Sequence, residues 1–196
     1  MIFGATSYKD TKFGIIARNK LIKLEIEGVI KGLEFIKNIS KDSDIKIAPE
    51  LIKKIHKKSF GWIFPKWAGK FRTINVTFSG KEAIEFYKIS EAITDLCLDL
   101  EERIKHLPTK TDINYLDEII RLLAWFQHRF VQIHPFNDYN GRTARLLTTL
   151  QLAKFRLPSI EIESDTKQDR KIYIKALQKA DNGDYSQLKK LISDSL

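Results

Sequence analysis

Two apolar stretches with helical spacing, one on each side of a short polar segment, constrain the fold of this chain more than any other feature. In residues 112–133 apolar side chains recur every three or four positions, which is the spacing of one face of an α-helix. A stripe this wide is typical of a central helix buried on most sides. Residues 141–155 repeat the pattern before Pro158, so residues 135–140 are predicted to form a loop between two core helices. The first stripe consists of Leu116, Ile119, Ile120, Leu123, Phe126, Phe130 and Ile133.

The same spacing predicts most of the remaining elements. One helix is expected over residues 18–38, and Pro49 suits the first turn of a second. Further helices are expected over 81–105, 167–180 and 184–194, and Asp112 is a candidate N-cap for the central helix. Residues 73–78 alternate β-branched and polar side chains before a Ser-Gly pair, which predicts a hairpin. The predicted fold is therefore all-α with one small β-hairpin. The helix over 18–38 is expected to bury a stripe of Ile22, Ile26, Val29, Ile30, Leu33 and Ile36.

Length, charge and cysteine content limit the class of protein. The 196 residues suit one domain, and their 43% hydrophobic content excludes a disordered chain. A single cysteine, Cys97, excludes an intrachain disulfide and a multi-cysteine zinc site, which favours a reducing, cytoplasmic location. No secretory signal opens the sequence, and no run approaches the roughly 18 apolar residues of a membrane span. The net charge of +9 favours anionic partners, but its lysines are spread along the chain, which argues against a dedicated nucleic-acid surface.

Residues 134–145, HPFNDYNGRTAR, concentrate the residue types that anion binding and catalysis need. A helix that begins here presents backbone N–H groups to phosphate, and Gly141 lets a ligand approach them closely. Arg142 and Arg145 lie three positions apart on one face of the first turn. Asp138 offers a hard oxygen ligand for Mg²⁺, and His134, with an ordinary pKa of about 6.5, suits a general base. Each residue alone could be a structural cap, but together they predict a phosphate-binding catalytic site.

This segment resembles the signature of the Fic (Fido) family, HxFx(D/E)GNGRxxR, which it matches at His134, Phe136, Asp138, Asn140, Gly141, Arg142 and Arg145. Tyr139 departs from the pattern, because the family usually has a small residue there. Two further segments, 55–72 and 173–192, resemble the family's approach to its hairpin flap and its C-terminal helices. The resemblance covers about residues 47–193. It implies a Fic-type helical bundle over 47–196, with residues 1–46 as an N-terminal arm that carries a candidate inhibitory helix.

The resemblance implies transfer of AMP from Mg²⁺-ATP to a Ser, Thr or Tyr hydroxyl of a target protein. His134 would be the general base, Asp138 would hold Mg²⁺, and Phe136 would anchor the loop in the core. Nucleotide binding would fall to Tyr139, Asn140, Gly141, Arg142 and Arg145. The flap, residues 70–78, would bind the target by strand addition, with Lys70, Phe71, Arg72 and Thr73 as its candidate contacts. An antitoxin or other inhibitory partner and a homo-oligomer are also compatible with the family.

The sequence is also compatible with alternatives to AMP transfer. Relatives of the toxin Doc transfer phosphate and commonly have Lys where this chain has Gly141, so Gly141 favours AMP. Other members transfer different nucleotides or phosphocholine, and Tyr139 leaves that open. A third alternative is a Fic-fold binding module that has weak catalytic activity. Nucleic-acid binding through the basic surface is disfavoured because no recognisable nucleic-acid motif is present.

Many members of the family are inhibited by a helix with the pattern (S/T)xxxE(G/N), whose glutamate pairs with the second arginine of the signature. Residues 23–30, KLEIEGVI, fit the end of this pattern at Glu27 and Gly28, although Lys23 replaces the Ser/Thr. Glu27 is therefore the candidate brake on Arg145, and Glu25 is a nearby competitor. The alternative is that Glu27 is an ordinary solvated helix carboxylate.

Overall fold

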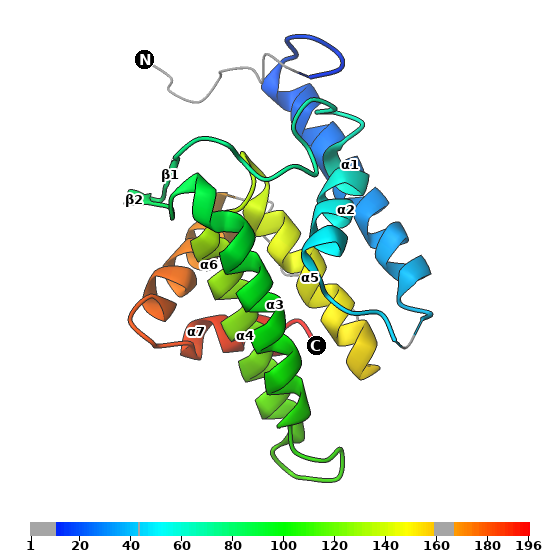
Figure 1. The fold of residues 1–196 in the computed structure, drawn as a ribbon, viewed down its shortest axis with the longest axis vertical. Helices are drawn as coiled ribbons and strands as arrows, with labels where there is room; N and C mark the ends of the chain where they lie inside the picture. The colour runs from blue at the N-terminus through cyan, green and yellow to red at the C-terminus, as the bar shows by residue number, and fades with distance from the viewer. Residues whose placement is uncertain (1–10, 43, 159–166) are drawn as a thin grey trace.

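In a computed structural model that describes residues 11–42, 44–158 and 167–196, the chain is mostly helical (Figure 1). The helices are α1 Arg18–Ile39, α2 Pro49–Phe60, α3 Ile89–Lys105, α4 Tyr115–Ile133, α5 Asn140–Phe155, α6 Lys167–Ala180 and α7 Ser186–Ser193. Two short strands, β1 Thr77–Phe78 and β2 Lys81–Glu82, pair antiparallel, and a 3-10 turn, Phe86–Lys88, leads into α3. The predicted all-α architecture with one hairpin is confirmed.

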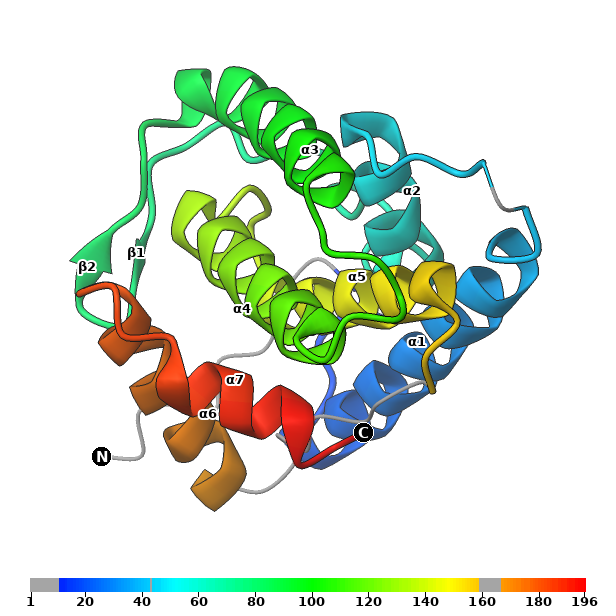
Figure 2. The same cartoon turned by 90° about the horizontal axis from the view of Figure 1, so that it is seen from below.

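Helix α4 is the centre of the fold, with α3, α5 and α7 in contact with it (Figure 2). Its predicted apolar stripe is buried except at the first turn, where Leu116 is exposed. Phe126 and Phe130 are fully buried in the largest core cluster, beside side chains of α3 and α5. Full burial of such a side chain stabilises the fold by roughly 1.5–3 kcal/mol. The core therefore fixes both helices that lead into and out of residues 134–140.

Helix α1 turns a different face to the core from the predicted one. Four members of the predicted stripe, Ile22, Ile26, Ile30 and Leu33, are between 36% and 49% exposed. The buried face consists of Leu21, Glu25, Gly28, Gly32 and Ile36. A Cβ on Gly28 would lie 2.6 Å from the Ser59 carbonyl oxygen, and one on Gly32 would lie 2.3 Å from the Ser59 hydroxyl. Ile36 is buried as predicted, but the prediction was wrong at the four exposed positions, because the two glycines allow α1 to approach α2 more closely than an isoleucine face would.

The hairpin is shorter than the alternating sequence predicts. Pairing is limited to Thr77 with Glu82 and Phe78 with Lys81. Between these pairs Ser79 and Gly80 both have positive φ, 49° and 79°, which is the backbone of a tight hairpin turn. Lys81 forms an ion pair with Asp181, just after α6, and so ties the hairpin to the C-terminal helices.

Other differences from the sequence predictions are local. Helix α3 begins at Ile89 because Lys81 and Glu82 belong to the hairpin. The Asp112 carboxylate accepts hydrogen bonds from the backbone and hydroxyl of Thr109, so it stabilises the preceding turn and does not cap α4. Within the three described stretches of the chain, no helix has the length and apolarity needed to cross a membrane.

Candidate functional site

The motif loop, residues 134–140, joins α4 to α5 through two residues with left-handed backbone, His134 (φ 51°) and Tyr139 (φ 61°). Asn140 closes this loop with both ends of its side-chain amide. Its Oδ1 accepts from the Phe136 N–H at 2.9 Å, and its Nδ2 donates to the Phe136 carbonyl at 2.9 Å. Phe136 itself is fully buried in the core. These contacts hold the loop without using the side chains of His134 or Asp138.

The His134 imidazole is arranged as a proton acceptor. Its Nδ1 lies 3.3 Å from the Val131 carbonyl oxygen, which can only accept, so Nδ1 carries the hydrogen and Nε2 has the lone pair. The ring stacks on Phe78 of β1 with centroids 4.2 Å apart. Burial, with a smaller contribution from the nearby positive charge of Arg72, lowers the pKa of His134 to about 4. At neutral pH His134 is therefore uncharged and able to accept a proton at Nε2.

A second histidine, His56 of α2, contacts the motif loop through Phe136 and Asp138. Its Nδ1 accepts from the Gly69 N–H at 2.8 Å, so its Nε2 carries the hydrogen and donates to the Asp138 carbonyl at 3.2 Å. The ring also stacks on Phe136 with centroids 3.8 Å apart, and burial lowers its pKa to about 4. His56 thus positions the backbone of Asp138. The sequence signal for this role was weak, because only its place in a family-like segment marked it.

The Asp138 side chain is the metal-ligand candidate of the loop. One carboxylate oxygen, Oδ1, accepts from the Tyr139 N–H at 2.7 Å, which orients the group. Among the described residues no group of three or more His, Cys, Asp or Glu side chains is placed to hold a metal ion. A lone carboxylate fits Mg²⁺, which usually keeps several waters and binds substrate phosphates. It does not fit a metal that needs a full set of protein ligands.

The start of α5 offers a helix N-terminus to an anion. A Cβ added at Gly141 would meet only ordinary contacts at 3.7 Å, from Arg145 and the Tyr173 ring, so the fold itself does not require glycine here. Close approach of a ligand to the backbone would require it. The Arg145 guanidinium lies 5.2 Å from the centre of the buried Tyr173 ring of α6. The Arg142 guanidinium contacts α1, where it bonds the Glu25 carboxylate.

Tyr139 fills the space between the motif loop and the aromatic connector, residues 59–72. Its ring stacks on Phe60 with centroids 4.2 Å apart and lies near Phe64 and Trp67. Its hydroxyl donates to Glu25 Oε1 at 2.9 Å. The side chain that replaces the family's small residue is thus a buried part of the core, and it brings α1 into contact with the motif loop.

Glu25, and not Glu27, is the carboxylate that reaches the motif loop. Its side chain is 1% exposed and receives hydrogen bonds from Tyr139, from Arg18 at 2.9 Å and from Arg142 at 3.0 Å. Glu27 is 50% exposed and forms an ion pair with Lys31 one turn along α1, at 3.1 Å. The predicted contact between Glu27 and Arg145 is therefore absent from the structure. Glu25 shares a helix face with Leu21 and Gly28, which is the signal that could have selected it.

The four candidate target contacts, residues 70–73, precede the paired strands. Arg72 is buried, and its guanidinium donates to the carbonyl oxygens of His134 at 2.8 Å and of Ile74 at 2.7 Å, and to that of Ile84. It therefore caps the C-terminal end of α4, and its buried side chain is not exposed at the surface of the protein. Phe71 lies 5.6 Å from Phe136, centre to centre. Lys70 donates to the Lys66 carbonyl, and Thr73 is exposed.

Solved structures share this fold at low sequence identity. Fic-1 of C. elegans aligns over 100% of this chain and 51% of its own, with a TM-score of 0.69 and 23% identity. The BepC effector protein of Bartonella tribocorum, solved with bound AMPPNP, aligns over 100% of this chain and 94% of its own, with a TM-score of 0.70 and 20% identity. These likenesses establish a Fic-type fold.

Curated relatives match most of this chain but only part of themselves. A protein adenylyltransferase Fic of Nematostella vectensis is 29% identical over 180 residues, which is 89% of this chain and 38% of the relative. The corresponding protein of Drosophila grimshawi is 30% identical over 87% of this chain and 32% of its own length. The chain thus spans about a third of the length of these relatives. The Fic/DOC family model matches residues 46–152, more than half of the chain, and includes the motif loop with its neutral histidine. The chain therefore belongs to the Fic/DOC family.

Proposed function

We propose that this chain is a protein adenylyltransferase, which transfers AMP from ATP to a hydroxyl group of a target protein. The observation that carries the proposal is the neutral His134, whose Nε2 has a lone pair, at the start of the loop that leads into α5. Among the residues that the structure describes, the N-terminus of α5 has no side-chain cap hydrogen bond. The names of the curated relatives support AMP as the transferred group. The hairpin, whose Phe78 touches His134, is the proposed docking site for the target backbone.

The reaction that follows from this arrangement has one proton transfer and one displacement at phosphorus. His134 Nε2 takes the proton from the target hydroxyl, and the oxygen attacks the α-phosphorus. A new P–O bond forms to the target while the bond to pyrophosphate breaks. With a pKa of about 4, His134 is a weak base in the nucleotide-free protein. A bound triphosphate would raise this pKa through its negative charge and so strengthen the base.

Phosphate binding is assigned to the first turn of α5, where the N–H groups and helix dipole favour an anion. Gly141 would allow close approach, and Arg142 and Arg145 would neutralise phosphate charge. Asp138 would hold Mg²⁺, which supplies charge neutralisation at the phosphates when bound. The Bartonella protein solved with AMPPNP supports nucleotide binding at this fold. The buried free thiol of Cys97 is compatible with the proposed cytoplasmic location.

The structure also supports an internal brake formed by Glu25. While its carboxylate holds Arg142, that arginine is neutralised and cannot serve a phosphate group. The carboxylate would also repel a triphosphate at the start of α5. We therefore assign the inhibitory role to Glu25 in place of Glu27, whose side chain faces solvent and Lys31. This proposed brake lies within the chain itself.

The test compares labelling by ATP that carries the label on the α-phosphate or on the γ-phosphate, with Mg²⁺, followed by intact mass spectrometry. Four variants are compared with the wild type: Glu25→Gln, Glu27→Gln, His134→Ala and the double variant that combines Glu25→Gln with His134→Ala. We expect an adduct of the mass of AMP that increases in Glu25→Gln and disappears whenever His134 is replaced. The matched Glu27→Gln variant should behave like the wild type.

Other outcomes would contradict distinct parts of the proposal. A γ-labelled adduct of the mass of phosphate would replace AMP transfer with kinase chemistry. An adduct that increases in Glu27→Gln but not in Glu25→Gln would return the brake to the residue that the sequence pattern favours. Nucleotide binding without any adduct in Glu25→Gln would support the alternative of a binding module with little catalytic activity.

A further inference from the structure

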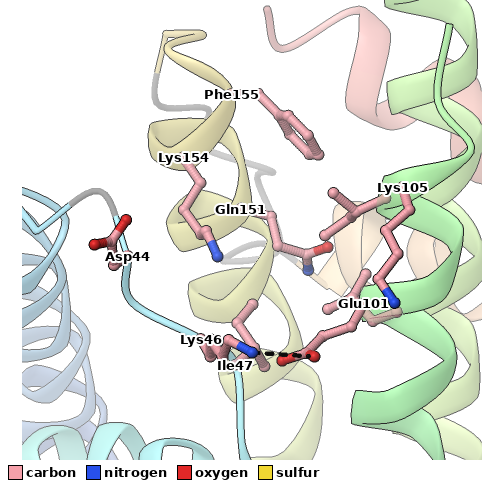
Figure 3. A pocket seen from close by; sticks show the side chains of 10 residues that line it. Asp44, Lys46, Ile47, Glu101, Lys105, Gln151, Lys154 and Phe155 are labelled. Carbon is pink, nitrogen blue, oxygen red and sulfur yellow. Dashed lines mark hydrogen bonds and ion pairs between the residues drawn. The ribbon is translucent and has the colours of Figure 1, made fainter.

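At the end of α5 far from the motif loop, a cavity of about 460 Å³ lies between α3, α5 and the segment before α2 (Figure 3). Its walls are mainly apolar and include Ile47, Leu100, Ile104 and Phe155. Ligand sites typically have volumes of about 300–1,000 Å³ and combine such walls with a few placed polar groups. About 11 residues of helix, or roughly 16 Å, separate Asn140 from Gln151, so this cavity is distinct from the proposed nucleotide site.

One buried polar atom in the wall of this cavity has no hydrogen-bond partner in the part of the chain that the structure describes. Gln151 is 1% exposed, and its side chain extends from α5 into the space between that helix and α3 (Figure 3). Its Nε2 donates to the Leu147 carbonyl at 3.3 Å, which fixes that end of the amide as the NH₂ group. The other end, Oε1, is buried and accepts no hydrogen bond. An unpartnered buried acceptor is costly, and a ligand N–H or O–H group would satisfy it.

The charged side chains around the cavity favour an acidic ligand. Lys46, Lys105 and Lys154 line it against two carboxylates, Asp44 and Glu101, and Glu101 pairs with Lys46 at 3.5 Å. Lys154 is partly buried and donates to the Ile45 carbonyl, which carries only a partial charge. Burial lowers the pKa of Lys154, so an anion beside it would stabilise the charged ammonium.

From these three observations we infer that the α3–α5 cavity binds a small aromatic or alicyclic acid that also carries an N–H or O–H donor. The ring of the ligand packs against the apolar walls, its N–H or O–H group donates to Gln151 Oε1, and its acid group lies beside Lys154. No contact in this arrangement involves the motif loop, and the inference does not depend on the proposed adenylyltransferase activity.

Indole-3-propionate has all three features and serves as the probe. Two analogues test the contributions of the N–H donor and the acid group separately: naphthalene-2-propionate has no N–H donor, and 3-methylindole has no acid group. Binding is measured on the whole chain by NMR titration of ¹⁵N-labelled protein. We expect shift changes around residues 100–105 and 151–155, and a dissociation constant about 3- to 10-fold higher for each analogue.

Variants test the same contacts from the protein side. Gln151→Leu should weaken indole-3-propionate about 3- to 10-fold and leave naphthalene-2-propionate unchanged, because only the first loses a hydrogen bond. Lys154→Met should weaken both acids about tenfold, whereas the exposed Lys110→Met serves as its control. Thermal unfolding checks folding, and Gln151→Leu should be no less stable than the wild type because it removes an unpartnered oxygen. The inference is overturned if indole-3-propionate does not bind, if it binds no better than both analogues, or if neither variant changes its affinity.

Discussion

Replacing Tyr139 by glycine would restore the residue type that the family motif usually has, yet the structure predicts that it destabilises the fold. Two opposing effects decide the result. Tyr139 has φ of 61°, a left-handed conformation that costs a non-glycine residue roughly 1–2 kcal/mol. Its ring, however, is buried against Phe60, Phe64 and Trp67. Removing a buried aromatic side chain typically costs about 3–5 kcal/mol.

The phenol hydroxyl adds a further contribution of about 2 kcal/mol through its hydrogen bond to the buried Glu25 carboxylate. Loss of packing and of this bond therefore exceeds the relief of backbone strain by about 4 kcal/mol. For a chain of this size that corresponds to a fall in melting temperature of roughly 8–16 °C. The control Tyr139→Phe keeps the ring and loses only the hydroxyl, so it should cost about 2 kcal/mol.

Urea denaturation followed by tryptophan fluorescence measures both free energies of unfolding, because Trp62 and Trp67 lie in the same connector as the rings around Tyr139. A Tyr139→Gly protein as stable as the wild type would show that backbone strain outweighs the aromatic packing. It would also refute the claim that this tyrosine holds α1 and the connector against the motif loop.

Three further predictions concern groups around the motif loop. Phe78→Ala should let water reach the imidazole of His134 and raise its pKa from about 4 toward the ordinary value, which NMR titration of the ring measures. An unchanged pKa would show that a group other than Phe78 excludes water from the ring. The free energy of unfolding should fall as pH drops from about 6.5 to about 4, because in that pH range His56 and His134 take up protons only in the unfolded chain. A His56→Gln variant should lose stability less steeply over this range, and a slope equal to that of the wild type would contradict the claim that burial lowers the pKa of His56. Arg72→Lys and Arg72→Met should each destabilise the fold by about 2–4 kcal/mol in urea denaturation, because a lysine ammonium cannot reach the three separate carbonyl oxygens that the guanidinium bonds. A lysine variant as stable as the wild type would show that the planar shape of the guanidinium is not needed.

The elements predictable from sequence were those whose apolar spacing coincides with burial. Helix α4 carries such a stripe from Ile119 to Ile133, and the polar segment after it was correctly placed between two helices. Helix α1 has equally regular apolar spacing, but the face that packs is chosen by Gly28 and Gly32. Periodicity counts hydrophobic side chains and takes no account of how closely two helix backbones can approach. That is why the wrong face of a correctly predicted helix was assigned to the core.

Some residues of the candidate site could be found from one short sequence segment, whereas others are brought to it only by the tertiary fold. The residue types from His134 to Arg145 were visible in the sequence because they lie within one short segment. The groups that set their chemistry come from elsewhere: Phe78 from the hairpin, His56 from α2 and Glu25 from α1. Glu27 fitted the sequence pattern of an inhibitory helix, whereas the choice of Glu25 depends on the rotation of α1 about its axis. Sequence spacing alone does not determine that rotation.

The motif loop separates the residues that hold its shape from those that would act on a substrate. Arg72 bonds the last carbonyls of α4, His56 bonds the Asp138 backbone, and Asn140 closes the loop. The His134 side chain, by contrast, makes one long contact with a carbonyl oxygen and a stacking contact with Phe78. Loss of Arg72, His56 or Asn140 therefore removes structure and activity together, whereas loss of the imidazole removes a proton acceptor from a loop that other residues keep in place. For this reason His134→Ala is a sound control for chemistry in the labelling experiment: its expected inactivity would not follow from unfolding.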